Sequence, residues 1–154
     1  MKRAIALLAL AAALAAGCDD GDGGERDPRT DFVKSADRIC LKSGIRPKAV
    51  PNDLAQAAEQ LSEEARLRAR VHAELRALGD PPAELRGDWP RFLELTGTVA
   101  RELRRMAGVA RAGESAELAE LSRRAGETET ERQRLGERIG FRRCGRPITE
   151  PLRP

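Results

Sequence analysis

Two long segments of this 154-residue chain repeat a mostly apolar position at alternating intervals of three and four. This spacing places the side chains along one stripe of an α-helix, as at the seam of an antiparallel bundle. Between residues 88 and 112 the stripe is Trp89, Phe92, Thr96, Val99, Leu103, Met106 and Ala110, and between 114 and 139 it is Leu118, Leu121, Ala125, Thr128, Arg132, Leu135 and Ile139. No segment alternates as a β-strand does. The pattern predicts an all-α protein.

Two more helices are expected before this pair. Residues 31–42 form a short amphipathic segment that ends at Ser43-Gly44. A long helix should begin at Asn52 or Asp53, run to about residue 78 and stop at the Gly-Asp-Pro-Pro turn of 79–82. Since aromatic residues make up only 3% of the chain, the core should be thin and need a covalent staple. We therefore predict an antiparallel bundle of three long helices plus one short N-terminal helix, closed by a disulfide.

The first seventeen residues indicate export. Lys2 and Arg3 precede thirteen Ala, Ile and Leu residues, a run too short to span a bilayer but suited to a signal peptide. Ala15-Ala16-Gly17 before Cys18 resembles a bacterial lipobox. The resemblance implies cleavage before Cys18, a diacylglyceryl group on its thiol, and a place on the outer face of the cytoplasmic membrane. The alternative is an ordinary secretory signal in which Cys18 is a bystander.

The remaining chain divides by composition. Residues 18–30 hold the candidate lipidated cysteine and an acidic, apolar-free stretch that we interpret as a flexible tether. The helical domain is expected over 31–147, and 148–154 form a C-terminal tail. The formal charge of +3 falls to +1 once the signal peptide is removed, which argues against nucleic acid as a partner.

With Cys18 assigned to lipid, Cys40 and Cys144 remain as an even pair in an oxidising compartment, where a disulfide is expected. Free thiols or metal ligands are the alternatives. A metal site is disfavoured because the chain has one histidine and no Cys-x-x-Cys motif. To bring the two cysteines together, the short helix must end part-way along the bundle or lie obliquely across it.

Three residues are candidates for a ligand or partner site: His72, Trp89 and Arg132. Each also has a structural interpretation. His72 fits the edge of the core, Trp89 fits a plug at the end of the bundle, and Arg132 fits a side chain that reaches solvent or pairs with a glutamate. With them, Thr96 and Thr128 could form a polar layer or a small pocket. No catalytic constellation accompanies His72.

A basic stretch follows the last helix. Arg142, Arg143 and Arg146 could contact anionic lipid or a polymer of the cell envelope, or form a solvated face that complements the helix C-terminus. No aromatic residues are interleaved as in a nucleic-acid-binding surface.

Four motifs in this order, FVKSADRIC (32–40), LRALGDPP (75–82), DWPRF (88–92) and GFRRCGRP (140–147), resemble a group of small actinobacterial secreted proteins and lipoproteins. The resemblance implies a helical, disulfide-linked lipoprotein and brings no activity with it. We expect a non-enzymatic module without a cofactor that binds a protein or envelope partner. The alternative is a carrier of a small amphipathic or anionic ligand held between helices.

Overall fold

The computed structural model describes residues 27–43 and 50–145, and within them it is helical without a β-strand. The predicted signal peptide, Cys18, Arg146 and the predicted C-terminal tail lie outside the described residues. A short 3-10 helix, η1, links the first two of the three long helices. The helices are α1 (Pro28–Lys42), α2 (Leu54–Arg76), η1 (Ala83–Leu85), α3 (Trp89–Ala112) and α4 (Ser115–Ile139). The predicted all-α class and the division into one short and three long helices are confirmed.

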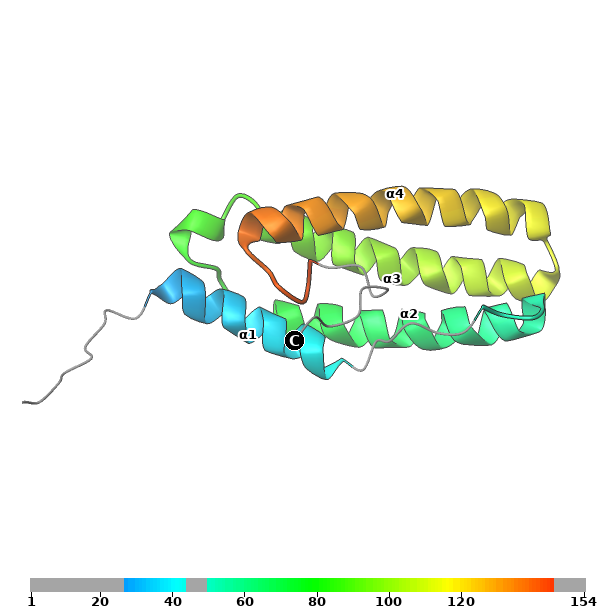
Figure 1. Cartoon of the computed structure of the whole chain (residues 1–154), viewed down its shortest axis with the longest axis horizontal. Coiled ribbons are helices and arrows are strands. Elements are labelled where there is room, and N and C mark those ends of the chain that lie inside the picture. The colour runs from blue at the N-terminus through cyan, green and yellow to red at the C-terminus, as the bar shows by residue number, and fades with distance from the viewer. Residues whose placement is uncertain (1–26, 44–49, 146–154) are drawn as a thin grey trace, which may run out of the picture.

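The three long helices lie side by side with alternating direction, and α3 packs against both α2 and α4 (Figure 1). The short helix α1 lies along the C-terminal part of α2 and runs opposite to it. It ends part-way along the bundle, as the separation between the two cysteines required (Figure 1).

Helix α1 begins at Pro28, three residues earlier than predicted, so residues 28–30, which were assigned to the predicted tether, belong to this helix. The reason is a strong local start signal. The carboxylate of Asp27 accepts hydrogen bonds from the backbone amides of Arg29 and Thr30. Proline at the first helical position costs nothing, because that amide would have no intrahelical partner. The acidic composition around this signal led the sequence analysis to place these residues in the tether.

The other helix ends follow their predicted signals closely. Asp53 caps α2 by accepting a 2.7 Å hydrogen bond from the amide of Gln56. Gly113 and Gly140 terminate α3 and α4 with φ of 77° and 100°, a left-handed conformation that glycine adopts without strain. These signals are local, so the sequence was sufficient to find them.

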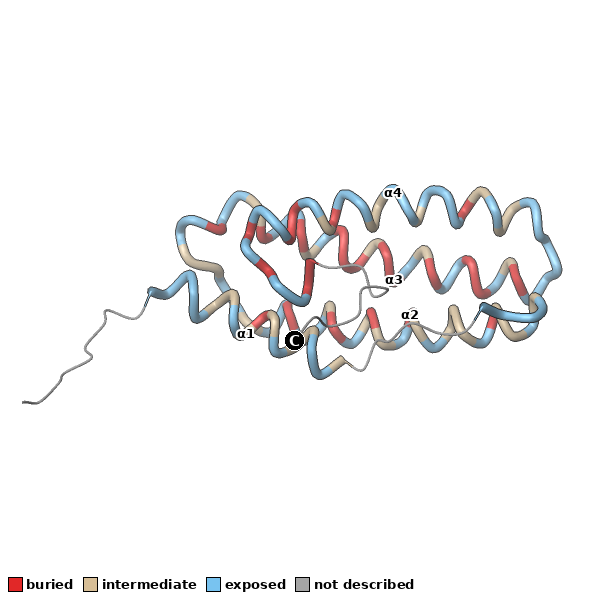
Figure 2. Tube along the Cα trace, in the orientation of Figure 1, coloured by how far each residue is buried: buried red, intermediate tan, exposed pale blue. Residues whose placement is uncertain are grey.

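The core is concentrated on α3 (Figure 2). All seven members of its predicted stripe are buried, and so are Leu95, Ala100 and Ala107 on adjoining faces. A helix that is buried on more than one face must be the central one, which agrees with its packing against two neighbours. One apolar cluster lies where α1 covers the bundle, and a second joins α2, α3 and α4 further along.

Candidate functional site

All four aromatic residues of the chain meet at the end of the bundle that α1 covers. Trp89 lies with its ring centroid 4.9 Å from that of Phe32 in an edge-to-face arrangement, and 5.9 Å from that of Phe92. Phe141, in the turn after α4, completes the group at 4.9 Å from Phe92. The side chain of Trp89 is fully buried, so its structural interpretation as a plug is the one the geometry favours.

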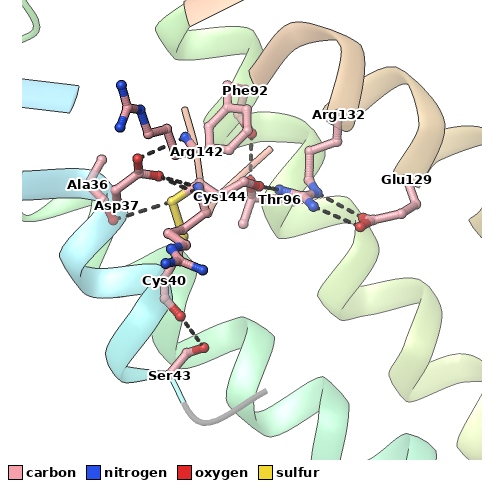
Figure 3. The surroundings of a disulfide bond; sticks show 11 residues. Ala36, Asp37, Cys40, Ser43, Phe92, Thr96, Glu129, Arg132, Arg142 and Cys144 are labelled. Atoms are coloured by element: carbon pink, nitrogen blue, oxygen red, sulfur yellow. Dashed lines mark hydrogen bonds and ion pairs between the residues drawn. A yellow bond between two sulfur atoms is a disulfide. The ribbon is translucent and has the colours of Figure 1, made fainter. Parts of the chain in front are cut away.

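The predicted disulfide is present. It joins Cys40, in the last turn of α1, to Cys144, and the two Cα atoms are 5.3 Å apart (Figure 3). Cys144 is buried in the same apolar cluster as the aromatic side chains. The disulfide therefore attaches α1 to the turn that follows α4.

Asp37 was not singled out from the sequence, yet it organises this turn. Its carboxylate accepts hydrogen bonds from three consecutive backbone amides, those of Arg142 at 2.8 Å, Arg143 at 2.9 Å and Cys144 at 3.0 Å (Figure 3). Successive amides that converge in this way form a concave anion site. Here a carboxylate of the same chain occupies it. No short motif signals this contact, because the partners are more than a hundred residues apart.

Arg132 is buried at 3% exposure and pairs with a glutamate, which was one of its two structural interpretations. Its guanidinium donates to both carboxylate oxygens of Glu129, at 2.7 and 2.8 Å, and to the backbone carbonyl of Cys144 (Figure 3). The guanidinium carbon also lies 5.6 Å from the ring centroid of Phe92. The charge of Arg132 is thus committed to the fold.

Arg132 and Glu129 form a polar layer within the bundle. Arg68 extends this layer to α2, because its guanidinium lies 3.6 Å from Glu129. Burial alone would raise the pKa of the Glu129 carboxyl. The hydrogen bond from Arg132 and the charges of Arg132 and Arg68 outweigh it, so the pKa is lowered. One nitrogen, Nε of Arg68, is buried without a hydrogen-bond partner among the described residues. The layer joins α2 to α4 and favours one register of the bundle.

Each seam threonine bonds to a backbone carbonyl of its own helix, and Thr128 also reaches α3. The hydroxyl of Thr96 donates to the carbonyl of Phe92 at 2.7 Å on the same helix. Thr128 donates to Glu102 of α3 at 3.0 Å and to the carbonyl of Arg124. Neither threonine lines the surface pocket between α1 and α4.

His72 is half-buried, and its imidazole lies against the small residue Gly97 of α3. Desolvation lowers the pKa of His72, and the nearby charges of Arg76 and Arg101 lower it further. In the described part of the chain, His72 has no hydrogen bond or ion pair with Trp89 or Arg132. The described residues therefore show no polar contact that would join His72 to the other two candidates in one site.

A surface pocket of about 320 Å³ lies between the N-terminal half of α1 and the end of α4. Its lining includes Arg29, Val33, Lys34, Asp37, Ile139 and Arg142. None of His72, Trp89 and Arg132 lines it. Of this lining, only Arg142 was predicted from the sequence to contact anionic lipid or an envelope polymer.

No helix among the described residues is long and apolar enough to cross a bilayer. The same residues contain no cluster of three or more potential metal ligands. Comparisons with known proteins gave no significant match: no family model fits the chain, and neither a curated protein nor a solved structure is similar to it.

Proposed function

We propose that this chain is a lipid-anchored lipoprotein on the outer face of the cytoplasmic membrane, and that it acts as a non-enzymatic module. Its surface would bind a protein or another component of the cell envelope. The lipobox-like sequence at Cys18 supports the anchor, and the disulfide fits an oxidising compartment.

The buried contacts of Trp89 and Arg132 in the core favour binding at the surface over carrying a ligand between the helices. Trp89 is packed among three phenylalanines, and all three guanidinium nitrogens of Arg132 donate to Glu129 or to the carbonyl of Cys144. A ligand held between the helices would have to displace these partners and leave a buried charge unpaired. Binding at the surface has no such cost, so it is the function we favour.

The anchor is tested by labelling cells with an alkyne fatty acid and purifying the protein. Wild type should carry the label, and its mass should show a diacylglyceryl group on Cys18. Cys18→Ser should lose both, because a hydroxyl does not replace the thiolate in forming the thioether. A Cys40→Ser/Cys144→Ser double variant is the matched control and should keep the label. A labelled Cys18→Ser protein would refute the anchor.

A further inference from the structure

The pocket between α1 and α4 combines positive side chains with an apolar lining. Arg29 and Lys34 come from α1, and Arg142 comes from the turn after α4. Val33 and Ile139 supply apolar surface to the same pocket. Its volume of about 320 Å³ lies at the lower end of the range of about 300–1,000 Å³ typical of ligand sites.

Two of the three cations have no polar side-chain partner among the described residues. Arg29 donates to the carbonyl of Ile139 at 3.2 Å, so one of its nitrogens is already engaged at the end of α4. The side chains of Lys34 and Arg142 have no hydrogen bond or ion pair within the described residues, and the Arg142 guanidinium extends away from the disulfide (Figure 3). Both therefore retain their full donor capacity for a ligand.

The negative groups at this pocket already accept hydrogen bonds from within the fold. Asp37 directs its carboxylate to three backbone amides. The C-terminus of α4 carries a partial negative charge, but the amides of Gly140 and Phe141 and the guanidinium of Arg29 occupy its last carbonyls. Three cations against one engaged carboxylate leave the pocket positive, which selects for an anion.

We propose that this pocket binds the phosphodiester headgroup of an anionic phospholipid such as phosphatidylglycerol. Lys34 and Arg142 would contact the phosphate oxygens, and Val33 and Ile139 would contact the glyceryl carbons. The inference rests on the proposed anchor, because a lipid on Cys18 would keep the pocket near a membrane. Arg29 follows Cys18 by eleven positions in the sequence, and a chain of this length spans at most about 40 Å.

Native mass spectrometry of the full mature protein, purified in detergent from its own membranes, tests this inference. Wild type should retain one added phosphatidylglycerol, and phosphatidylcholine at the same concentration should be retained at least about tenfold less. Millimolar soluble glycerophosphoglycerol should compete with the lipid. The Lys34→Gln/Arg142→Gln variant should retain at least about tenfold less phosphatidylglycerol than wild type, because two charge-assisted contacts are removed.

An Arg70→Gln/Arg104→Gln variant is the matched control. It removes the same charge from exposed positions of α2 and α3, outside the pocket lining, and should bind as wild type does. Equal thermal unfolding of the two double variants checks that the pocket variant is folded. Equal lipid retention by wild type and pocket variant would overturn the inference, and so would equal retention of the two lipids. Binding of glycerophosphoglycerol or inorganic phosphate without phosphatidylglycerol would overturn the lipid assignment.

The same measurement separates this inference from the anchor. A covalent diacylglyceryl group on Cys18 survives denaturation, whereas a phospholipid in the pocket is released. A protein without the covalent group that still binds phosphatidylglycerol would refute the anchor and retain the pocket. A lipidated protein with no pocket lipid would retain the anchor and refute the pocket.

Discussion

At the scale of single residues, two glycines allow the turn that carries Cys144 to lie directly on α4. A Cβ atom at Gly136 would lie 2.7 Å from the Cα of Gly145, and a Cβ at Gly145 would lie 3.1 Å from the carbonyl carbon of Gly136. The contact at Gly136 is with backbone, which cannot rotate away as a side chain can. The lack of a side chain at Gly136 is therefore a packing requirement.

Gly136→Ala should lower the free energy of unfolding by about 1–3 kcal/mol, because the turn must move away from α4. Gly126→Ala is the matched control on the same helix, since nothing lies within 4 Å of its added Cβ. That variant should be stabilised by about 0.5–1 kcal/mol through its higher helix propensity. Urea denaturation followed by circular dichroism measures both. A neutral or stabilising Gly136→Ala would contradict the close contact.

His72 should make stability depend on pH. Burial first, then the charges of Arg76 and Arg101, lower its pKa below the ordinary 6.5. The unfolded chain therefore binds a proton at higher pH than the folded chain does. The contribution of His72 is complete above pH 6.5 and is lost as the pH falls towards the folded pKa.

The His72→Gln variant, which cannot titrate, should thus lose less free energy of unfolding than wild type between about pH 7 and pH 5. Urea denaturation at a series of pH values measures how the free energy of unfolding of each protein changes with pH. The same pH dependence in both proteins would show that His72 has the same pKa in the folded and unfolded chain.

At the scale of elements, α1 is held to the end of α4 by three different groups along its length. Arg29 donates to the carbonyl of Ile139, Asp37 accepts from the amides of 142–144, and Cys40 forms the disulfide. An isolated helix of 15 residues is marginally stable in water. Its tertiary attachments must therefore supply most of its stability.

Asp37→Ala should lower the free energy of unfolding by about 1–2 kcal/mol, because three amides lose their acceptor and turn to water. It should also speed reduction of the disulfide by dithiothreitol, since the turn around Cys144 opens more often. Glu59→Ala removes an exposed carboxylate of α2 that has no polar partner among the described residues. It should leave both quantities close to wild type. Unchanged reduction kinetics in Asp37→Ala would contradict its role in holding the turn.

At the scale of the whole molecule, the disulfide closes nearly the entire domain, because its cysteines are 104 residues apart. A loop of this size lowers the entropy of the unfolded chain by an amount equivalent to about 4–5 kcal/mol in the chain-entropy model. The Cys40→Ser/Cys144→Ser variant should be destabilised by a comparable amount in urea.

Alkylation of the unreduced wild type should leave both cysteines unlabelled. A labelled Cys40 or Cys144 would show that the protein exists with free thiols.

The helices could be predicted from the sequence more fully than the contacts around Trp89. The stripe of α3 and the glycine at its end are repeated local signals, and they located the helix from Trp89 to Ala112. The aromatic plug was foreseen only as one of two interpretations of Trp89. Phe141 was not expected in it, because a residue beyond a helix end has no periodicity to place it.

The sequence by itself determined the helical class, most helix ends to within a few residues, and the partner of each domain cysteine, since these depend on local spacing and on a count of two. Only the tertiary structure decided that Asp37 serves the turn at 142–144, that Glu129 neutralises Arg132, and that Arg29, Lys34 and Arg142 converge. Helical periodicity determines which face a residue occupies. The identity of its neighbour depends on how helices far apart in the chain are aligned along their axes, and that alignment arises from the packing of the whole core.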